Sequence, residues 1–295
     1  MYVIIGATGN TGRRITENLL AQDKQVTAIS RTEAHLTDLV GRGATAAVGT
    51  LDDIDFLTET FHSATGVYLM IPPNFTAADF REYQQTVAQA LTEAVRRAGV
   101  RHAVVLSSIG AHSDQSGVVA GLRDFEAMLK GVEGLNVLFL RAGFFMQNFY
   151  GNIGLIKGMG INGGFPIEGD ITMPIVHVND IADVATQHLL ALDFQGASHT
   201  YAVGERDLSL KEATQVLGSA IDRPELPWVT FPYEQARAGM VQMGMSESLA
   251  DAYVQFGRAT NEGTLMADYR RTPENTTPTS LEAFAQEFSG AYAQS

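Results

Sequence analysis

Three glycines spaced three residues apart give the first chemical signal in this sequence. They lie in the segment Gly6-Ala7-Thr8-Gly9-Asn10-Thr11-Gly12, between a short apolar run and a segment with helical spacing. The first glycine permits a sharp turn, the second lets the backbone approach a pyrophosphate, and the third lets helix and strand pack closely. The backbone amides of about Asn10–Arg13 would then face the phosphates at the start of a helix. A tight glycine turn without a ligand is the alternative, but the position between strand and helix favours a dinucleotide.

The end of the second apolar run indicates which dinucleotide is bound. An NAD site presents Asp or Glu to the ribose 2′-hydroxyl about 20 residues after the glycine loop. This sequence reads Ala28-Ile29-Ser30-Arg31 there, with no acid before Glu33. The missing carboxylate removes repulsion of a 2′-phosphate, and Arg31 is a bidentate partner for one. Arg13 is a second candidate partner, and solvated surface arginines are the alternative. The sequence therefore predicts NADP(H) as cofactor.

These cations stand in an acidic chain of 295 residues, with 20 Lys and Arg against 33 Asp and Glu and a formal charge of −13. Such a surface repels a nucleic-acid backbone. The absence of cysteine excludes disulfides, thiolate catalysis and Cys-based metal sites. No apolar run approaches the ~18 residues of a membrane span, and the first residues do not resemble a signal peptide. We expect a cytoplasmic protein without nucleic-acid or membrane partners, for which a homodimer is a possible assembly.

Alternating strand and helix patterns must position these residues. An acidic start at Asp79 and the pair Arg96-Arg97 before Gly99 mark the best-defined helix, 79–98. The alternation predicts an α/β fold, a doubly wound parallel sheet covered on both faces. Apolar runs predict strands at 2–5, 26–29, 46–48, 67–71, 103–106 and 137–140, and helical spacing predicts helices near 12–22, 32–40, 53–62, 79–99 and 121–131.

The pattern changes after about residue 143. Residues 1–150 are expected to form the nucleotide-binding domain and 151–295 mainly a smaller substrate lobe, with 174–192 returning to the first domain. The glycine-rich stretch 151–164 is expected to be an irregular excursion over a pocket. Ser209 and Glu212 form a capping-box pattern. Further expectations are a strand at 174–178, helices at 179–192 (with Asn179 or Asp180 as N-cap), 208–220, 233–243 and 246–257 and from Ser280, and a loop with a short extended piece at 223–232.

Several ordered stretches resemble the NmrA-like family of atypical short-chain dehydrogenases/reductases, which includes quinone-reductase-like members. Together they span nearly the whole chain, and RAGFFMQN is the most specific of them. They are the glycine loop, Ser30-Arg31, VVLSSIG (104–110), RAGFFMQN (141–148), VHVNDIADV (176–184), and YAVG (201–204) followed by LSLKEA (208–213).

The resemblance implies a Rossmann domain with a small C-terminal lobe and a role for each matching residue. The glycine loop would hold the pyrophosphate through Gly6, Thr8, Gly9, Asn10, Thr11 and Gly12, and Ser30 and Arg31 would hold the 2′-phosphate. Thr50 and Leu51 would lie beside the adenine, although Thr50 departs from the Asp that is common there. The remaining residues are Ile71, Pro72, Ser107 and Ser108 at the cofactor's central portion, and Phe144, Phe145 and Asn148 bordering nicotinamide and substrate, with ordinary core packing as the alternative for the phenylalanines.

The catalytic residues depart from the usual reductase pattern. Standard short-chain reductases place Tyr-x-x-x-Lys beyond the fifth strand, where the lysine lowers the tyrosine pKa for proton transfer. Residues 109–135 contain no tyrosine, and no tyrosine in the chain has a lysine four residues later. Ser108 matches the family's serine, and His112 is a candidate proton donor, with an exposed loop histidine as the alternative. His177, Asp180 and Asp183 match a strand-to-helix junction, so we predict no metal site.

Two mechanisms remain open without that tyrosine. An NADPH-dependent reductase can transfer hydride to a small electron-poor acceptor such as a quinone, because the product is a stabilised anion that solvent can protonate. Alternatively, the chain is a catalytically silent NADP(H) sensor that acts through a protein partner, as some relatives do. An isomerase related to the same reductases is a further alternative. The reductase is the preferred interpretation.

Overall fold

A seven-stranded parallel sheet is the largest layer of the computed structural model, which describes residues 1–295. Its order is β10-β6-β5-β4-β1-β2-β3, and all neighbouring strands run parallel. The order reverses between β1 and β4, which is the point where a doubly wound sheet binds its ligand. The predicted fold class is therefore confirmed. The strands are β1 (Tyr2–Ile4), β2 (Val26–Ser30), β3 (Thr45–Val48), β4 (Gly66–Leu69), β5 (His102–Ser108), β6 (Asn136–Ala142) and β10 (Ala197–Ala202).

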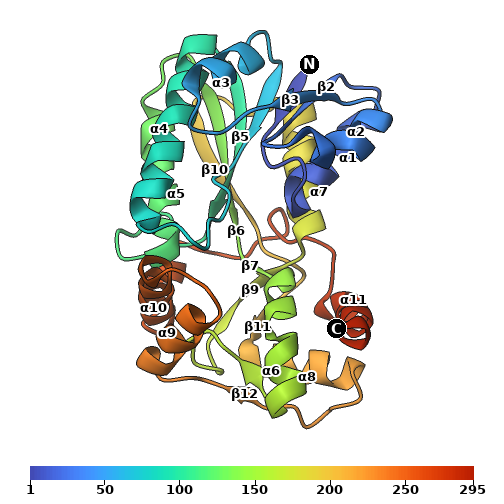
Figure 1. The fold of residues 1–295 in the computed structure, drawn as a ribbon, viewed down its shortest axis with the longest axis vertical. Helices are drawn as coiled ribbons and strands as arrows, with labels where there is room; N and C mark the ends of the chain where they lie inside the picture. Colours follow the sequence, from blue (N-terminus) through green and yellow to red (C-terminus); the bar gives the residue numbers. More distant parts are fainter.

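Helices cover both faces of this sheet, as the continuous apolar strands require (Figure 1). Successive residues of β1 enter different cores: Tyr2 and Ile4 pack on one face, Val3 on the other. The first face carries α1 (Asn10–Leu20), η1 (Glu33–Leu36), α2 (Thr37–Gly41) and α7 (Val178–Ala191). The second face carries α3 (Ile54–Phe61), α4 (Phe80–Ala98) and α5 (Ala120–Lys130).

The predicted start and end of helix α4 are both confirmed. The Asp79 carboxylate accepts a hydrogen bond from the Glu82 amide, and Gly99 ends the helix in the left-handed conformation with φ +64°. The N-cap of α7 differs from the prediction of Asn179 or Asp180. His177 caps this helix, because its Nδ1 accepts from the Asn179 amide at 3.1 Å. The Asp180 carboxylate is instead bonded to Thr279.

The chain returns to the large sheet after its first excursion. Helix α7 packs against α1, and β10, a strand that we did not predict, pairs with β6 along six residues. The strand expected at 174–178 is β9 (Thr172–Val176), which belongs to a separate small sheet in the order β11-β9-β7. The other two strands of that sheet are β11 (Asp207–Ser209) and β7 (Phe144–Phe145).

A second core forms the lobe below the sheet in Figure 1. The expectation of an irregular excursion at 151–164 is wrong, because most of this stretch continues as helix. Ile153 and Ile156 enter the lobe core, and this burial outweighs the poor helix propensity of the glycines. The predicted capping box of Ser209 and Glu212 is present. The elements are η3 (Met146–Asn152), α6 (Ile153–Met159), β8 (Asn162–Gly163), α8 (Leu210–Ala220), β12 (Trp228–Val229) and α11 (Leu281–Gln294).

Two further helices pack against each other, and the second of them contacts the loop that follows β5. They are α9 (Tyr233–Gln242) and α10 (Glu247–Asn261), and η4 (Thr264–Met266) follows them. In Figure 1 they lie below α5. Helix α10 contacts η2 (Gly117–Val119) so closely that a Cβ on Gly117 would lie 2.1 Å from the Ala252 carbonyl oxygen. None of the helices combines the length and apolar character needed to cross a membrane.

Candidate cofactor and active site

The glycine loop requires glycine at its two ends for different reasons. Gly6 follows β1 with φ +68°, and a Cβ there would lie 2.4 Å from the Met70 sulfur. A Cβ on Gly12 would lie 2.3 Å from the Gly6 carbonyl oxygen. The loop closes on itself through a hydrogen bond from the Gly9 amide to the same carbonyl at 2.9 Å. A larger residue at Gly6 would therefore collide with Met70, and a larger residue at Gly12 would collide with the backbone of the loop.

The first turn of α1 is prepared for an anion. Gly9 is its N-cap and supplies no side-chain hydrogen bond, and the first turn contains no acid. The amides of Asn10, Thr11 and Gly12 therefore lack intrahelical or side-chain acceptors, and the helix dipole adds positive potential. These features fit the pyrophosphate of a dinucleotide. Thr8 and Asn10 are exposed beside the loop.

A buried tyrosine that the sequence analysis missed supports this loop from below. The Tyr68 hydroxyl of β4 donates to Thr11 Oγ1 at 3.0 Å, and Tyr68 is fully buried. Burial raises the pKa of Tyr68, so its hydroxyl keeps its proton and remains a donor. The Thr11 side chain is accordingly anchored to the sheet, and its backbone amide is the group left for a phosphate.

The structure separates the two arginines proposed for the 2′-phosphate. Arg31, after β2, is exposed and forms no ion pair, whereas Arg13 pairs with Glu17 at 3.2 Å and with Asp38. Arg13 is therefore already neutralised. Ser30, at the end of β2, accepts a hydrogen bond from the Thr32 amide.

The residues expected near the adenine follow β3, and two of those expected at the cofactor's central portion follow β4. Leu51 and Ile71 pack at the edge of the core between the sheet and helices α3, α4 and α5, and Thr50 is exposed. The Tyr83 hydroxyl of α4, also missed from the sequence, donates to the Pro72 carbonyl at 2.9 Å. Burial raises the pKa of Tyr83, and the positive charge of Arg31 opposes this shift.

The two serines that end β5 do not share one environment. Ser107 was expected to face the cofactor, but its side chain is buried and its hydroxyl donates to Glu126 Oε1 of α5 at 2.7 Å. Ser108 Oγ is partly exposed and donates to the Ile109 carbonyl at 2.9 Å. The alternation of β5 causes this difference, because neighbouring strand residues face opposite sides. Ser108 is thus the serine with an accessible hydroxyl.

A buried ion pair lies behind these serines. Arg141, in β6, donates to Glu126 through Nε at 3.0 Å and Nη2 at 2.8 Å, and both side chains are buried. Burial alone would raise the pKa of Glu126, but hydrogen bonds from Arg141 and Ser107 outweigh it and hold the pKa below its ordinary value. Glu126 is therefore a charged structural group at neutral pH.

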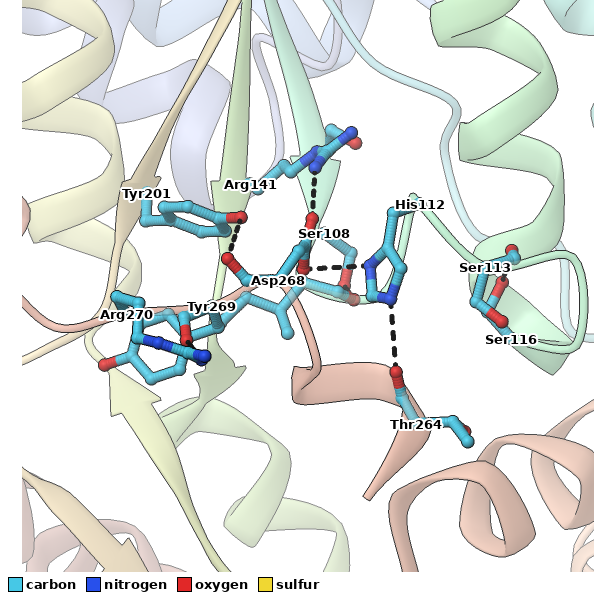
Figure 2. A network of polar contacts seen from close by, with 12 residues as sticks. Ser108, His112, Ser113, Ser116, Arg141, Tyr201, Thr264, Asp268, Tyr269 and Arg270 are labelled. Carbon is cyan, nitrogen blue, oxygen red and sulfur yellow. Dashed lines mark hydrogen bonds and ion pairs between the residues drawn. The ribbon is translucent and has the colours of Figure 1, made fainter. Parts of the chain in front are cut away.

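Arg141 also connects the sheet to the lobe (Figure 2). Its Nη1 donates to Asp268 Oδ2 at 2.8 Å, and Asp268 Oδ1 lies 2.9 Å from His112 Nδ1. The other ring nitrogen of His112 lies 3.2 Å from the Thr264 carbonyl oxygen. Both nitrogens thus contact protein, and Figure 2 shows the ring between Asp268 and Thr264. Asp268 was also missed, because nothing local in the sequence links it to positions 112 and 141.

Aromatic side chains follow β6 where the substrate was expected. Phe144 lies 5.7 Å from Phe149 and 5.6 Å from Phe165, measured between ring centroids, and Phe165 lies 5.8 Å from Tyr253 of α10. Phe144 and Phe145 are half-buried and pair with β9, so they serve packing as well as any ligand. Asn148 is exposed in η3.

Other features of the surface lie away from this edge. A surface depression of about 450 Å³ is lined by residues 61–65 and 98–102 and by Leu192. These residues precede β4 and β5, so the depression opens at the amino ends of the strands, opposite the glycine loop. No group of three or more His, Asp or Glu side chains is arranged to hold a metal ion.

Comparison with known proteins agrees with this geometry. Residues 6–154 match the family described as NAD(P)H-binding. The chain is 29% identical over 259 residues to the NAD(P)H azoreductase of Xenophilus azovorans, covering 85% of this chain and 84% of that protein. The NADPH complex of the Escherichia coli quinone oxidoreductase QOR2 superposes with TM-score 0.83 at 20% identity, over 97% and 99% of the two chains.

A second solved structure has the same fold. Triphenylmethane reductase of Citrobacter sp. with NADP(H) gives a TM-score of 0.80 at 18% identity, over 98% of this chain and 100% of that one. A structure of mutant NmrA also shares the fold, with a TM-score of 0.67 at 17% identity over 97% of this chain and 94% of that one, in agreement with the predicted resemblance. The family match confirms the predicted NAD(P)H-binding domain.

Proposed function

The chain belongs to the NAD(P)H-binding family, and from this premise we propose that it is an NADPH-dependent reductase of a small electron-poor acceptor such as a quinone. The observation that carries the choice of NADPH is Arg31, an exposed arginine without an ion pair directly after β2. Bound NADPH would supply the hydride. Gly6, Gly9 and the free amides of α1 hold its pyrophosphate, and Arg31 with Ser30 holds the 2′-phosphate.

The remaining site residues border the other parts of the cofactor and the acceptor. Thr50 and Leu51 border the adenine, and Ile71, Pro72 and Ser108 border the central portion of the cofactor. Phe144, Phe145 and Asn148 border the acceptor. We assign no phosphate contact to Arg13, because Glu17 and Asp38 already neutralise it. Ser107 acts through Glu126 and not on the cofactor.

The acceptor class follows from what the chain lacks. Helix α5 carries no Tyr-x-x-x-Lys, and its buried polar residue, Glu126, is ion-paired to Arg141. An acceptor that becomes a stabilised anion needs less help from a protein acid. The relatives support this class: one is named for azo compounds, one for quinones and one for triphenylmethane dyes. No observation in the structure favours the silent sensor.

The test is to mix the purified protein with NADPH and follow the loss of NADPH absorbance with a panel of acceptors. The panel contains quinones, azo dyes, triphenylmethane dyes and enones. We expect turnover with at least one quinone and slower turnover with NADH. Tight NADPH binding without oxidation by any acceptor, together with capture of a specific protein partner, would favour the sensor and refute the proposal.

A further inference from the structure

Helix α10 packs on the chain segments that follow β4 and β5. The Ser246 amide at its N-cap donates to the Phe75 carbonyl at 2.8 Å, and the Phe80 amide donates to Ser248 Oγ at 3.0 Å. Both partners follow β4. Gly117, which follows β5, packs on the backbone of Ala252. Through these contacts the helix is held on the side of the sheet's carboxyl edge, the edge outside which ligands bind in this fold.

Tyr253 extends the α10 contacts to the strand that follows. Its ring lies 5.8 Å from that of Phe165, and Phe165 stands edge-on to Phe144 at 5.6 Å with an interplanar angle of 89°. Phe144 comes directly after Gly143 at the end of β6. The three rings form a row from the end of β6 to α10, and we call this row the aromatic wall. Planar conjugated molecules pack well on such a surface.

The Tyr253 hydroxyl is the polar group of this wall. The side chain is half-buried, and its hydroxyl makes no hydrogen bond to the protein. Burial raises the pKa of Tyr253, so the hydroxyl stays protonated at neutral pH. A tyrosine hydroxyl that has no partner within the protein is available to a ligand. By contrast, the nearby Tyr233 hydroxyl is already in contact with Asn261.

We propose that Tyr253 is a catalytic residue of the reductase, which donates a hydrogen bond to the acceptor heteroatom on which negative charge develops. This inference rests on the proposed function and adds a group that contacts the acceptor. For a quinone, NADPH loses a hydride and becomes NADP+, while the quinone gains two electrons and one proton and becomes the hydroquinone anion. Solvent supplies the second proton, and Tyr253 keeps its own. The hydrogen bond stabilises the anion in the transition state.

The test compares Tyr253→Phe with wild type and with Tyr150→Phe. Phenylalanine keeps the ring packing and removes only the hydroxyl. Tyr150 is the matched control, because it is a lobe tyrosine stacked on Phe288 at 6.1 Å and lies on the α11 side. We expect Tyr253→Phe to lower kcat/KM for a quinone about 10- to 100-fold, mainly through kcat, with NADPH affinity unchanged. Tyr150→Phe should change kcat/KM less than about twofold.

A second acceptor distinguishes the loss of the Tyr253 hydrogen bond from a change in the shape of the site. A cationic triphenylmethane dye takes hydride at carbon and becomes neutral, so no anion develops. Its reduction should change less than about threefold in Tyr253→Phe. An unchanged quinone rate, or equal losses for quinone and dye, would overturn the role of the hydroxyl. Wild-type protein that reduces no acceptor would instead refute the proposed function, before any variant is compared.

Discussion

Replacing Glu126 by Gln removes one charge from a carboxylate whose side chain is 2% exposed, while shape and volume are nearly kept. The carboxylate accepts two hydrogen bonds from Arg141 and one from Ser107. Gln can accept through one oxygen, but its NH2 group would face a guanidinium N–H. Arg141 would be left in the interior with Asp268 as its remaining anionic partner.

The expected cost follows from that arrangement. Removing one partner of a buried ion pair costs about 3–5 kcal/mol, because the other charge stays desolvated. Since Arg141 keeps Asp268, we take the lower end, about 3 kcal/mol of the free energy of unfolding. For a chain of this size that corresponds to a melting temperature lower by about 5 °C.

Urea unfolding at two pH values tests the electrostatic origin of the loss. The pKa of Glu126 lies below its ordinary value of 4.5 in the folded protein, so its stabilising effect is complete above that pH. It is lost as the pH falls through the lower folded pKa, whereas Gln does not titrate. The gap between wild type and Glu126→Gln should therefore be full at pH 7 and shrink below pH 4.5.

A surface variant provides the control for this prediction. Glu93 also contacts two arginines, Arg96 and Arg97, but on the solvent-exposed side of α4. Exposed ion pairs add little stability, so Glu93→Gln should unfold almost as wild type does. A loss at Glu126 below about 1 kcal/mol, or equal losses at both positions, would refute the assignment of Glu126 as a buried structural charge.

Three further variants test the cofactor and proton-transfer assignments. Arg31→Ala should weaken NADPH binding about 10- to 100-fold and NADH binding less than about twofold in a fluorescence titration, and equal losses would refute the 2′-phosphate assignment. Gly12→Ala should abolish NADPH binding in the same titration, because its methyl group would lie 2.3 Å from the Gly6 carbonyl oxygen. His112→Ala should keep quinone reduction within about threefold, since both ring nitrogens already contact protein, and a loss of several orders of magnitude would show that the imidazole is the proton donor.

The parts of the site that could be predicted are those with local causes. The glycine loop is readable because its backbone conformation and close contacts demand glycine at Gly6 and Gly12. Continuous apolar runs likewise predicted six of the seven parallel strands, since both faces of this sheet are covered. The capping box of α8 could also be predicted, because Ser209 and Glu212 form reciprocal hydrogen bonds within one helical turn.

The parts that could not be predicted depend on contacts between distant residues. Arg141 and Asp268 are 127 positions apart, and neither has a neighbour that indicates the other. The prediction for the residues of helix α6 was wrong for a related reason. Its glycines suggest a loop, but burial of Ile156 in the lobe core stabilises the helix. Tyr253 carries no motif at all. Its role can be proposed only from the structure, in which its ring lies next to Phe165 and thereby extends the row of aromatic rings that begins at Phe144.

Helix α5 explains why the chemistry must differ from that of reductases with a tyrosine and lysine there. The inward side of α5 carries Glu126, which Arg141 holds as an anion, and an anion cannot donate a proton. Lys130 contacts the same carboxylate, so it is not free to lower the pKa of another group. Hydrogen-bond donation to the acceptor must then come from another element, and α10 presents the unpartnered hydroxyl of Tyr253. A hydroxyl with a raised pKa is a good hydrogen-bond donor and a poor acid, which suits acceptors whose reduced anion is stable enough to await a proton from solvent.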